Sequence, residues 1–409
     1  MPLRWQVSYV AVWVGWDEPP SLAFTSTGAP GIACYASDSS QLNFYEVNAN
    51  GFWVANPVDA QVNNSSSVSC SLAFHFNRPS IAYCVYDGFP AQPDLLRYAH
   101  RDGLLAFNVT DVGPAQRSGS SLAFAPNGLP SIAFYNANPG GTGYRQAGPS
   151  AWTGSAVDPK GTGGNISLAF TPTGHPAIAY MGGTDDGQTR LIKYAVFDGL
   201  HWRAETVAEG DNSPSLGFDP SGSPTIVYGV QNPMAVMCAR RGSSAWQISK
   251  VVDWGDSPSL AFTPAGDPAI AYVDLVYDAA VKYAVYRNGW KHYLVDQPSK
   301  QQAAFRGWYY WYYPSLAFNP VTGEPAIAYF QYGGACIKYA VGRFVPRGFG
   351  DIVTDIVTAM ARMVARWTRP RPPVPLPPER ERFRLAASAD GGDGPRTAAQ
   401  SASDGIKQQ

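Results

Sequence analysis

The residues best suited to chemistry in this 409-residue sequence are aromatic rings that alternate with carboxylates and amides. Residues 308–313 are an unbroken aromatic run, Trp-Tyr-Tyr-Trp-Tyr-Tyr. Flat rings can stack on the apolar face of a sugar or another small molecule, while carboxylates and amides can hydrogen-bond to its hydroxyl groups. On this reasoning the candidate ligand-binding residues are Trp16, Asp87, Asn136, Asp185, Asp186, Trp254, Asp274, Trp308, Tyr309, Trp311 and Gln331.

A catalytic centre is less well indicated than a binding site. Two carboxylates facing each other, such as Asp87 and Asp274, could act as a general acid and base, although ordinary hydrogen-bonding roles are favoured. Asp185 and Asp186 could bind a hard cation, but adjacent side chains on an extended chain diverge. The five histidines are scattered, so neither a histidine-activated nucleophile nor a histidine-rich metal site is expected. The sequence therefore predicts no metal site and no cofactor.

Composition limits the classes of protein to consider. The sequence has 41 glycines and 35 prolines, 13% aromatic residues and only 15% charged residues, which is typical of many short strands joined by tight turns. A net charge of −1 excludes a nucleic-acid-binding protein that relies on bulk positive charge. No apolar run approaches the ~20 residues of a membrane-spanning helix. No secretory leader is recognisable at the N-terminus, so a cytoplasmic location is expected.

A repeated four-part unit is the strongest signal in the sequence. The tetrapeptide Ser-Leu-Ala-Phe, or Ser-Leu-Gly-Phe in one copy, begins at Ser21, Ser71, Ser121, Ser167, Ser215, Ser259 and Ser315. Each copy continues through a turn into a segment like Ala-Ile-Ala-Tyr and then, less regularly, into segments like Lys-Tyr-Ala-Val and a strand that opens with tryptophan. Four short strands in a unit of about 40–50 residues are typical of a β-propeller blade.

Over residues 1–344 the chain resembles seven-bladed β-propellers in its repeat pattern, without the signature of a particular propeller family. The resemblance implies an all-β fold of seven four-stranded blades. Alternation along each strand puts leucine, isoleucine and aromatic side chains on one face and serine and alanine on the other, so the bulky face of one blade can pack on the small face of the next. An open solenoid of stacked sheets is the alternative, and it would need polar caps at both ends.

The two ends of the repeat region distinguish these alternatives. The seventh unit runs through Lys338 to Phe344 without a tryptophan-led fourth strand. The residues from Trp5 to Val10 have the spacing expected of that missing strand. We therefore expect the N-terminal segment to complete the seventh blade and close the ring, which removes both open sheet edges.

Propeller topology places all the candidate residues on one face. With strands labelled A to D from the axis outwards, A–B and C–D turns lie on one face, and B–C and D–A loops lie on the other. The A–B turns are nearly constant in length and rich in proline and glycine, whereas the B–C and D–A loops vary, as binding loops do. The aromatic run 308–313 belongs to a D–A loop. It could form a ligand platform or plug the axial channel, and both interpretations stay open.

Two cysteines raise the question of a disulfide. The five cysteines form no Cys-x-x-Cys pair and are expected to be buried and reduced. If Ser71 pairs with Tyr83, however, Cys70 and Cys84 face each other across a hairpin, close enough for a disulfide. The absence of a recognisable export signal favours the reduced form.

The sequence changes character after residue 344. Residues 349–368 place apolar side chains on one helical stripe, with aspartates near the start and arginines near the end, and predict an amphipathic helix. This helix could cover the channel mouth or bind a partner or a membrane surface. Residues 369–409 begin with a polyproline segment, in which a weak PxxP ligand spacing occurs, and continue into a small, polar tail that is predicted to be disordered.

Three functions are compatible with this organisation. The preferred one is a non-catalytic propeller that binds a glycan or a protein ligand through the face formed by the B–C and D–A loops. The first alternative is a lyase or hydrolase with an Asp/Tyr centre at the channel mouth. The second is an assembly scaffold that acts through the C-terminal helix and tail. No nucleic-acid partner and no membrane span are expected.

Overall fold

The computed structural model of the chain describes most of the repeat region. The described residues are 3–12, 19–36, 40–60, 62, 69–85, 94–103, 106–116, 119–136, 140–162, 166–184, 187–276, 279–297, 313–331 and 336–344. The chain divides into two units, Met1–Pro346 and Arg347–Gln409, and every described residue belongs to the first. The predicted helix at 349–368 and the tail at 369–409 lie outside the described residues.

The described residues form seven antiparallel sheets of four strands each. Blades 1 to 3 consist of β2 (Ser21–Phe24), β3 (Pro30–Ala36), β4 (Gln41–Val47) and β5 (Trp53–Asp59); β6 (Cys70–His75), β7 (Arg78–Val85), β8 (Leu95–His100) and β9 (Asn108–Pro114); β10 (Ser120–Phe124), β11 (Pro130–Tyr135), β12 (Thr142–Ala147) and β13 (Trp152–Asp158). Blades 4 and 5 consist of β14 (Ser167–Phe170), β15 (Pro176–Gly183), β16 (Arg190–Phe197) and β17 (Trp202–Glu209); β18 (Asn212–Phe218), β19 (Pro224–Gln231), β20 (Met234–Arg241) and β21 (Trp246–Asp253). Blades 6 and 7 consist of β22 (Gly255–Phe262), β23 (Pro268–Asp274), β24 (Ala280–Tyr286) and β25 (Trp290–Asp296); β26 (Ser315–Phe318), β27 (Pro325–Gln331), β28 (Cys336–Phe344) and β1 (Leu3–Val12).

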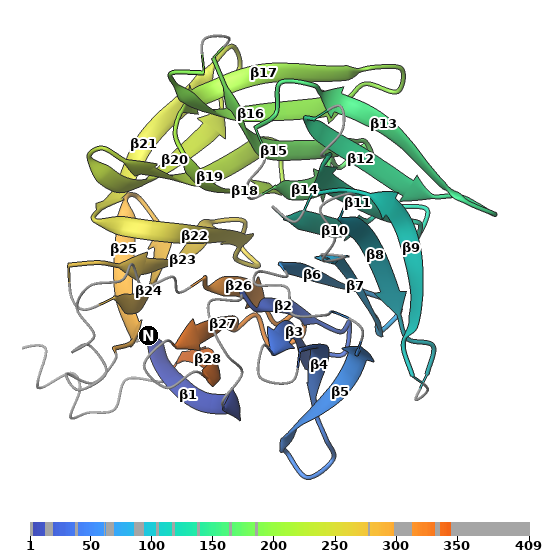
Figure 1. Cartoon of the computed structure of the whole chain (residues 1–409). Coiled ribbons are helices and arrows are strands. Elements are labelled where there is room, and N and C mark those ends of the chain that lie inside the picture. The colour runs from blue at the N-terminus through green and yellow to red at the C-terminus, as the bar shows by residue number, and fades with distance from the viewer. Residues whose placement is uncertain are drawn as a thin grey trace, which may run out of the picture. The chain divides into compact units, whose positions relative to one another are not determined.

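The seven sheets are arranged in a ring (Figure 1). The first strand of each blade, strand A, contacts strand A of the next blade, and the remaining strands follow outwards in chain order. The prediction of an all-β, seven-bladed propeller with four-stranded blades is therefore confirmed. The described residues include no helix with the length and hydropathy needed to cross a membrane.

The N-terminal strand closes the ring as predicted. β1 pairs antiparallel with β28 as the outermost strand of blade 7, in the sheet order β1-β28-β27-β26. Trp5 lies opposite Gly342, and Tyr9 lies opposite Lys338. Backbone hydrogen bonds between the two ends of the repeat region thus hold the first and last blades together.

A ring of side-chain hydrogen bonds links the seven A strands. In every blade the backbone N–H of the leucine in Ser-Leu-Ala-Phe donates to the serine hydroxyl of the preceding blade, at 2.9–3.0 Å. Ser315 of blade 7 accepts from Leu22 of blade 1, which closes the circle. These N–H groups lie on the inner edge of each sheet, where no further strand is present to accept from them. The serine of the neighbouring blade satisfies them instead.

Aromatic pairs hold the blades together further from the axis. At five junctions the tryptophan that opens strand D meets a tyrosine of strand C in the preceding blade edge-to-face, with ring centroids 5.2–5.5 Å apart. The pairs are Trp5–Tyr283, Trp53–Tyr339, Trp152–Tyr98, Trp202–Tyr144 and Trp246–Tyr194. This geometry is favoured by the ring quadrupoles, and it explains why tryptophan and tyrosine recur at fixed places in the repeat.

The predicted pairing of Ser71 with Tyr83 is wrong. Ser71 lies opposite Ala82, because the phenylalanine of Ser-Leu-Ala-Phe lies opposite the proline near the start of the next strand. The register places Cys70 opposite Tyr83 and removes the geometric basis for a disulfide with Cys84. All five cysteines are buried free thiols, and burial raises the pKa of Cys84 to about 12.

Replacing one serine of the inner ring should destabilise the propeller. Ser167→Ala leaves the inner-edge N–H of Leu216 without its acceptor, and an unsatisfied buried donor costs about 1–3 kcal/mol. Urea unfolding measures this loss, and amide exchange at Leu216 should become faster. Ser244→Ala, at an exposed turn, is the control and should change the free energy of unfolding by less than about 0.5 kcal/mol. Equal stability of the two variants would contradict the role of the ring.

Candidate functional site

Most of the residues singled out from the sequence lie outside the described residues. These are Trp16, Asp87, Asp185, Asp186, Trp308, Tyr309 and Trp311. The aromatic platform and the adjacent aspartates therefore stay predictions. The remaining candidates lie at the ends of B strands or in a D–A loop, on the predicted face: Asn136, Trp254, Asp274 and Gln331.

These four residues differ in exposure. Trp254 is 58% exposed in the D–A loop between β21 and β22, with a φ of 58°. Asp274 is only 4% exposed; it forms an ion pair with Lys282 and accepts a hydrogen bond from a backbone N–H two residues further along, at 2.9 Å. Gln331 is 2% exposed at the end of β27. Asn136 is half-buried and lines a pocket between blades 2 and 3.

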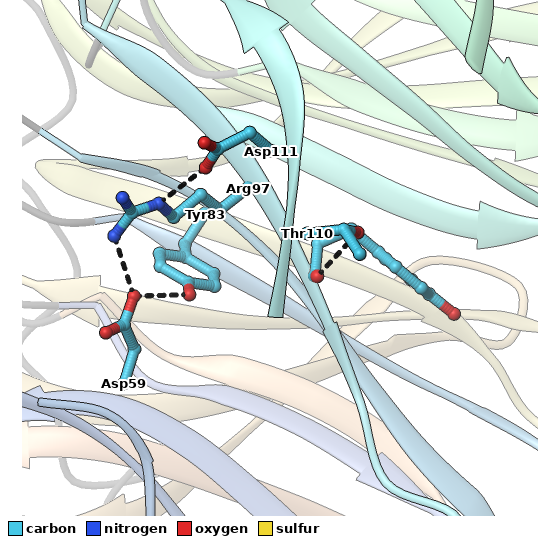
Figure 2. A network of polar contacts seen from close by, with 6 residues as sticks. Asp59, Tyr83, Arg97, Thr110 and Asp111 are labelled. Atoms are coloured by element: carbon cyan, nitrogen blue, oxygen red, sulfur yellow. Dashed lines mark hydrogen bonds and ion pairs between the residues drawn. The ribbon is translucent and has the colours of Figure 1, made fainter. Parts of the chain in front are cut away.

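A three-residue polar contact joins neighbouring blades below the loop face. The carboxylate of Asp59, at the end of β5, accepts a hydrogen bond from the Tyr83 hydroxyl at 2.7 Å and another from Nη1 of Arg97 at 3.0 Å (Figure 2). Nε of Arg97 also donates to Asp111 at 2.9 Å. The first aspartate belongs to blade 1, and the tyrosine and arginine belong to blade 2. We call an aspartate, a tyrosine and a basic residue joined in this way an interblade clamp.

The same clamp occurs at two further junctions. In each case the basic residue lies opposite the tyrosine on the adjacent strand, and the aspartate directly follows a bulge in strand D. A bulge re-aims the side chains that follow it, here toward the next blade. The residues are Asp158, Tyr180 and Lys193 between blades 3 and 4, and Asp296, Tyr329 and Lys338 between blades 6 and 7.

The protonation states in the clamp follow from burial and charge. Burial alone would raise the pKa of Asp158, but hydrogen bonds from Lys193, from the backbone N–H of Lys160 and from Tyr180 hold that pKa below its ordinary value. Burial, and then the charge of Asp158, raise the pKa of Tyr180. The phenol therefore stays protonated and donates, while the carboxylate stays charged at neutral pH.

A pocket of about 890 Å³ lies beside the clamp between blades 3 and 4. Its walls come from the D–A connection after β13, the end of β15, the B–C loop that follows it and the end of β11. The lining residues are Tyr135, Lys160, Gly161, Thr162, Met181, Gly182, Gly183, Thr184, Gly187, Thr189 and Arg190. The pocket thus lies on the face formed by the B–C and D–A loops.

Backbone contacts fix the walls of this pocket to the clamp. Oδ1 of Asp158 accepts from the backbone N–H of Lys160 at 2.9 Å, which holds the turn after β13. Gly161 then forms an isolated antiparallel bridge with Gly182, and the N–H of Thr162 donates to a carbonyl of β15 at 3.1 Å. The D–A connection of blade 3 is therefore joined to strand B of blade 4, and the clamp supports the pocket from below.

The lining has the chemistry of a site for a polar ligand. Tyr135 offers an aromatic ring, the threonines offer hydroxyl groups, and Lys160 and Arg190 bring positive charge to the rim. Glycine at position 182 makes room for the clamp lysine beside the pocket: a Cβ there would lie 2.4 Å from Cδ of Lys193. Sugars are bound by such combinations of a ring and hydrogen-bonding groups, and basic groups favour ligands with carboxylate or sulfate substituents.

Outside the pocket lining, the Asp211 carboxyl has a raised pKa and interacts electrostatically with Arg190. Burial raises the pKa of Asp211, and the charge of Arg190 partly offsets this effect. Oδ1 of Asp211 has no hydrogen-bond partner among the described residues. Burial also raises the pKa of Asp256, whose carboxylate accepts from Asn212 at 2.7 Å and is repelled by the charge of Asp211.

The lining residues were not among the candidates taken from the sequence. Asn136 was chosen because it is a polar loop residue, whereas its neighbour Tyr135 reads as the last residue of a buried strand. The usable signal was a departure from the repeat: strand B of blade 4 continues as Met-Gly-Gly-Thr after Tyr180, where other copies have larger side chains. Glycines at a strand end indicate close approach of another backbone or of a ligand.

Comparison with known proteins shows the fold. No family model and no curated protein matches the sequence. A polysaccharide lyase described as an ulvan lyase of a new family, bound to -[GlcA(1-4)Rha3S]-, is similar with a TM-score of 0.58 and 12% identity over 85% of this chain and 98% of its own. Polysaccharide lyase Uly1 gives 0.51 and 10% over 81% and 90%. The lectin SapL1 in complex with alpha methyl fucoside gives 0.46 and 12% over 70% and 98%.

Neutralising the clamp carboxylate should weaken the junction of blades 3 and 4 in a pH-dependent way. Asp158→Asn leaves Lys193 without its buried partner, and breaking such a pair costs about 3–5 kcal/mol. Because the pKa of Asp158 is lowered in the folded state, the ion pair stabilises the fold above the ordinary aspartate pKa of about 4, and this contribution is lost as the pH falls through the folded value.

Urea unfolding of wild type and Asp158→Asn across a pH series measures this difference. The gap between the two proteins should be full above about pH 5 and should shrink below about pH 4. The control is Asp102→Asn, which removes an exposed ion pair with Arg78 and should cost less than about 1 kcal/mol. A gap that does not change with pH would show that the charge of Asp158 does not stabilise the junction.

Proposed function

We propose that this protein is a carbohydrate-binding propeller and that the pocket between blades 3 and 4 binds the glycan. The observation that carries the proposal is the pocket itself, a hollow of about 890 Å³ that combines an aromatic ring, threonine hydroxyls and two basic groups. Variable loops on a rigid scaffold are where propellers and other repeat folds place their ligand sites. Lys160 and Arg190 favour a glycan with acidic substituents over a neutral one.

The similar structures support a glycan as the ligand class in preference to a protein. The ulvan lyase, which shares the fold over most of both chains, has a saccharide bound. Non-catalytic binding is the preferred function because the described lining of the pocket contains no carboxylate, histidine or cysteine, and only Tyr135 and Lys160 among it could act as a base.

A polysaccharide lyase is the second candidate, and Asp211 favours it. This carboxyl has a raised pKa and one unpaired oxygen, and it interacts electrostatically with Arg190 of the pocket. In such an enzyme Arg190 would neutralise a uronate carboxylate, and Asp211 would remove the proton on the adjacent carbon. A carbon–carbon double bond would then form as the bond to the leaving sugar oxygen breaks, and that oxygen would take up a proton. Turnover would rise with pH through the raised pKa of Asp211.

Glycan binding is tested on an array of neutral and acidic glycans, followed by titration calorimetry with the best ligand. We expect Arg190→Ala and Tyr135→Ala each to weaken binding about tenfold, because each removes one main contact. Arg203→Ala, an exposed residue of blade 4 away from the pocket, should bind like wild type. A Trp308→Ala/Trp311→Ala variant tests the predicted aromatic platform.

The outcomes separate the candidate functions. Unchanged binding by both pocket variants would contradict the proposed site, and loss of binding only in the tryptophan variant would move the site to the aromatic run. Failure of the wild type to bind any glycan would contradict the function as a whole. Release of unsaturated uronate products, measured by ultraviolet absorbance and abolished in Asp211→Asn, would establish the lyase.

The assembly scaffold remains a third proposal that concerns residues outside the described ones. If the C-terminal helix and tail recruit a partner, removal of residues 345–409 should abolish partner capture and leave the melting temperature of the propeller unchanged. Capture that persists after the truncation would contradict this function. The cytoplasmic location expected from the sequence is likewise a proposal, and fractionation of the producing cells tests it.

A further inference from the structure

The junction of blades 2 and 3 lacks the interblade clamp at all of its three positions. The residue after the strand D bulge is Gly113 in place of aspartate. Phe134 replaces the tyrosine, and Gly143, opposite it on strand C, replaces the basic residue. These positions are equivalent to Asp158, Tyr180 and Lys193 at the next junction.

A basic residue is nevertheless present, two positions further along strand C. Where blades 4, 6 and 7 read Lys-Tyr-Ala, blade 3 reads Gly-Tyr-Arg, so Arg145 occupies a place that holds a fully buried alanine in most blades. The glycines make room for its side chain: a Cβ on Gly113 would lie 2.0 Å from Nη1 of Arg145, and a Cβ on Gly154 would lie 2.9 Å from its Cγ. The side chain of Arg145 thus requires glycine at positions 113 and 154.

A pocket of about 430 Å³ opens around this arginine. The Arg145 guanidinium lies over the ring of Phe134, 5.0 Å from the centroid, and Nη1 donates to the carbonyl of Val112 at 2.6 Å. Trp152 contributes an aromatic wall, and Asn136 contributes an amide. A flat guanidinium backed by a ring, beside an indole and an amide, suits a planar anionic group carried on a sugar-sized ring.

Arg145 has no ion-pair partner among the described residues. The clamp residues Arg97, Lys193 and Lys338 each pair with an aspartate, whereas within the described part of the chain the side chain of Arg145 donates only to a neutral carbonyl. Burial lowers the pKa of Arg145, and no carboxylate of the described residues offsets this effect. A partly desolvated cation without a counter-charge gains from an anionic ligand.

We propose that this pocket is a second ligand site, which binds the carboxylate of a sugar acid through Arg145. It is separate from the pocket between blades 3 and 4, because consecutive residues of β11 and the loop after it, Tyr135 and Asn136, line different pockets. The two sites lie on either side of blade 3. The Arg145 guanidinium itself lies where the side chain of a clamp aspartate would begin, so the carboxylate of the ligand binds it from the side of the pocket.

The test uses D-glucuronate as the probe, D-glucose as its neutral match and inorganic sulfate as a second anion, with full-length protein. Binding is followed by titration of the arginine Nε–Hε signals. We expect wild type to bind glucuronate at least about tenfold more tightly than glucose, and Arg145→Gln to lose about tenfold in affinity. Arg145→Lys should lie between them, because it keeps the charge but lacks the planar fork. Arg203→Gln, at an exposed residue outside both pockets, should bind glucuronate here as wild type does.

A measurement on the wild type alone guards against misfolded variants. Phenylglyoxal modification of Arg145, read by peptide mass spectrometry, should be slowed by glucuronate and unaffected by glucose. Equal protection by both sugars, or none by either, would overturn the proposal. So would sulfate that binds at Arg145 as tightly as glucuronate, because the site would then recognise charge without the sugar acid. These results are independent of glycan binding at Arg190.

Discussion

Every blade of this propeller leaves the inner edge of its first strand without a pairing strand, and the fold depends on how that edge is satisfied. In each of the seven blades, the hydroxyl of one serine accepts a hydrogen bond from the leucine N–H at the inner edge of the next blade. Only a small side chain with an acceptor oxygen can do this where the strands converge. The last of these hydrogen bonds, from Leu22 to Ser315, can form only when the ring is closed. Closing the ring therefore also satisfies the last inner-edge N–H group.

The outer parts of the junctions are free to differ because the inner ring already fixes the blades. Three junctions hold an Asp–Tyr–basic clamp. At the junction of blades 5 and 6, Val252 stands at the position of the clamp aspartate. The tyrosine and the lysine there have other partners: Tyr272 shares a hydrogen bond with His292 at 2.9 Å, and Lys282 forms an ion pair with Asp274. Variation of this kind does not disturb the serine ring. It changes which polar groups are satisfied within the protein and which remain for a ligand.

The architecture could be predicted from the sequence, and the site largely could not. Repetition of whole strands indicated seven blades, and the spacing from Trp5 to Val10 indicated the closing strand. The repeated serines were interpreted only as small residues, since alternation gives the face of a side chain but not its hydrogen bond across a junction. The wrong pairing predicted for Ser71 has a different cause: the composition of a turn does not fix its length, and the length of the turn sets the register of the two strands. Pocket residues such as Tyr135 belong to the repeat by type, and only the three-dimensional junction shows that they line a hollow.

These junctions differ in whether a half-buried cation has a carboxylate partner within the chain. At the junction of blades 3 and 4, the charge of Lys193 is balanced by Asp158, and the contact is structural. This ion pair also holds the walls of the neighbouring pocket in place. At the junction of blades 2 and 3, Gly113 stands at the position equivalent to Asp158. Arg145, on strand C of blade 3, lies in a pocket there and has no ion-pair partner among the described residues. Replacement of all three clamp residues at this junction, together with an arginine two positions further along strand C, therefore leaves a recognition element in place of a stabilising contact without altering the fold. In a repeat protein, the copies that break the pattern are thus the first places to look for ligand sites.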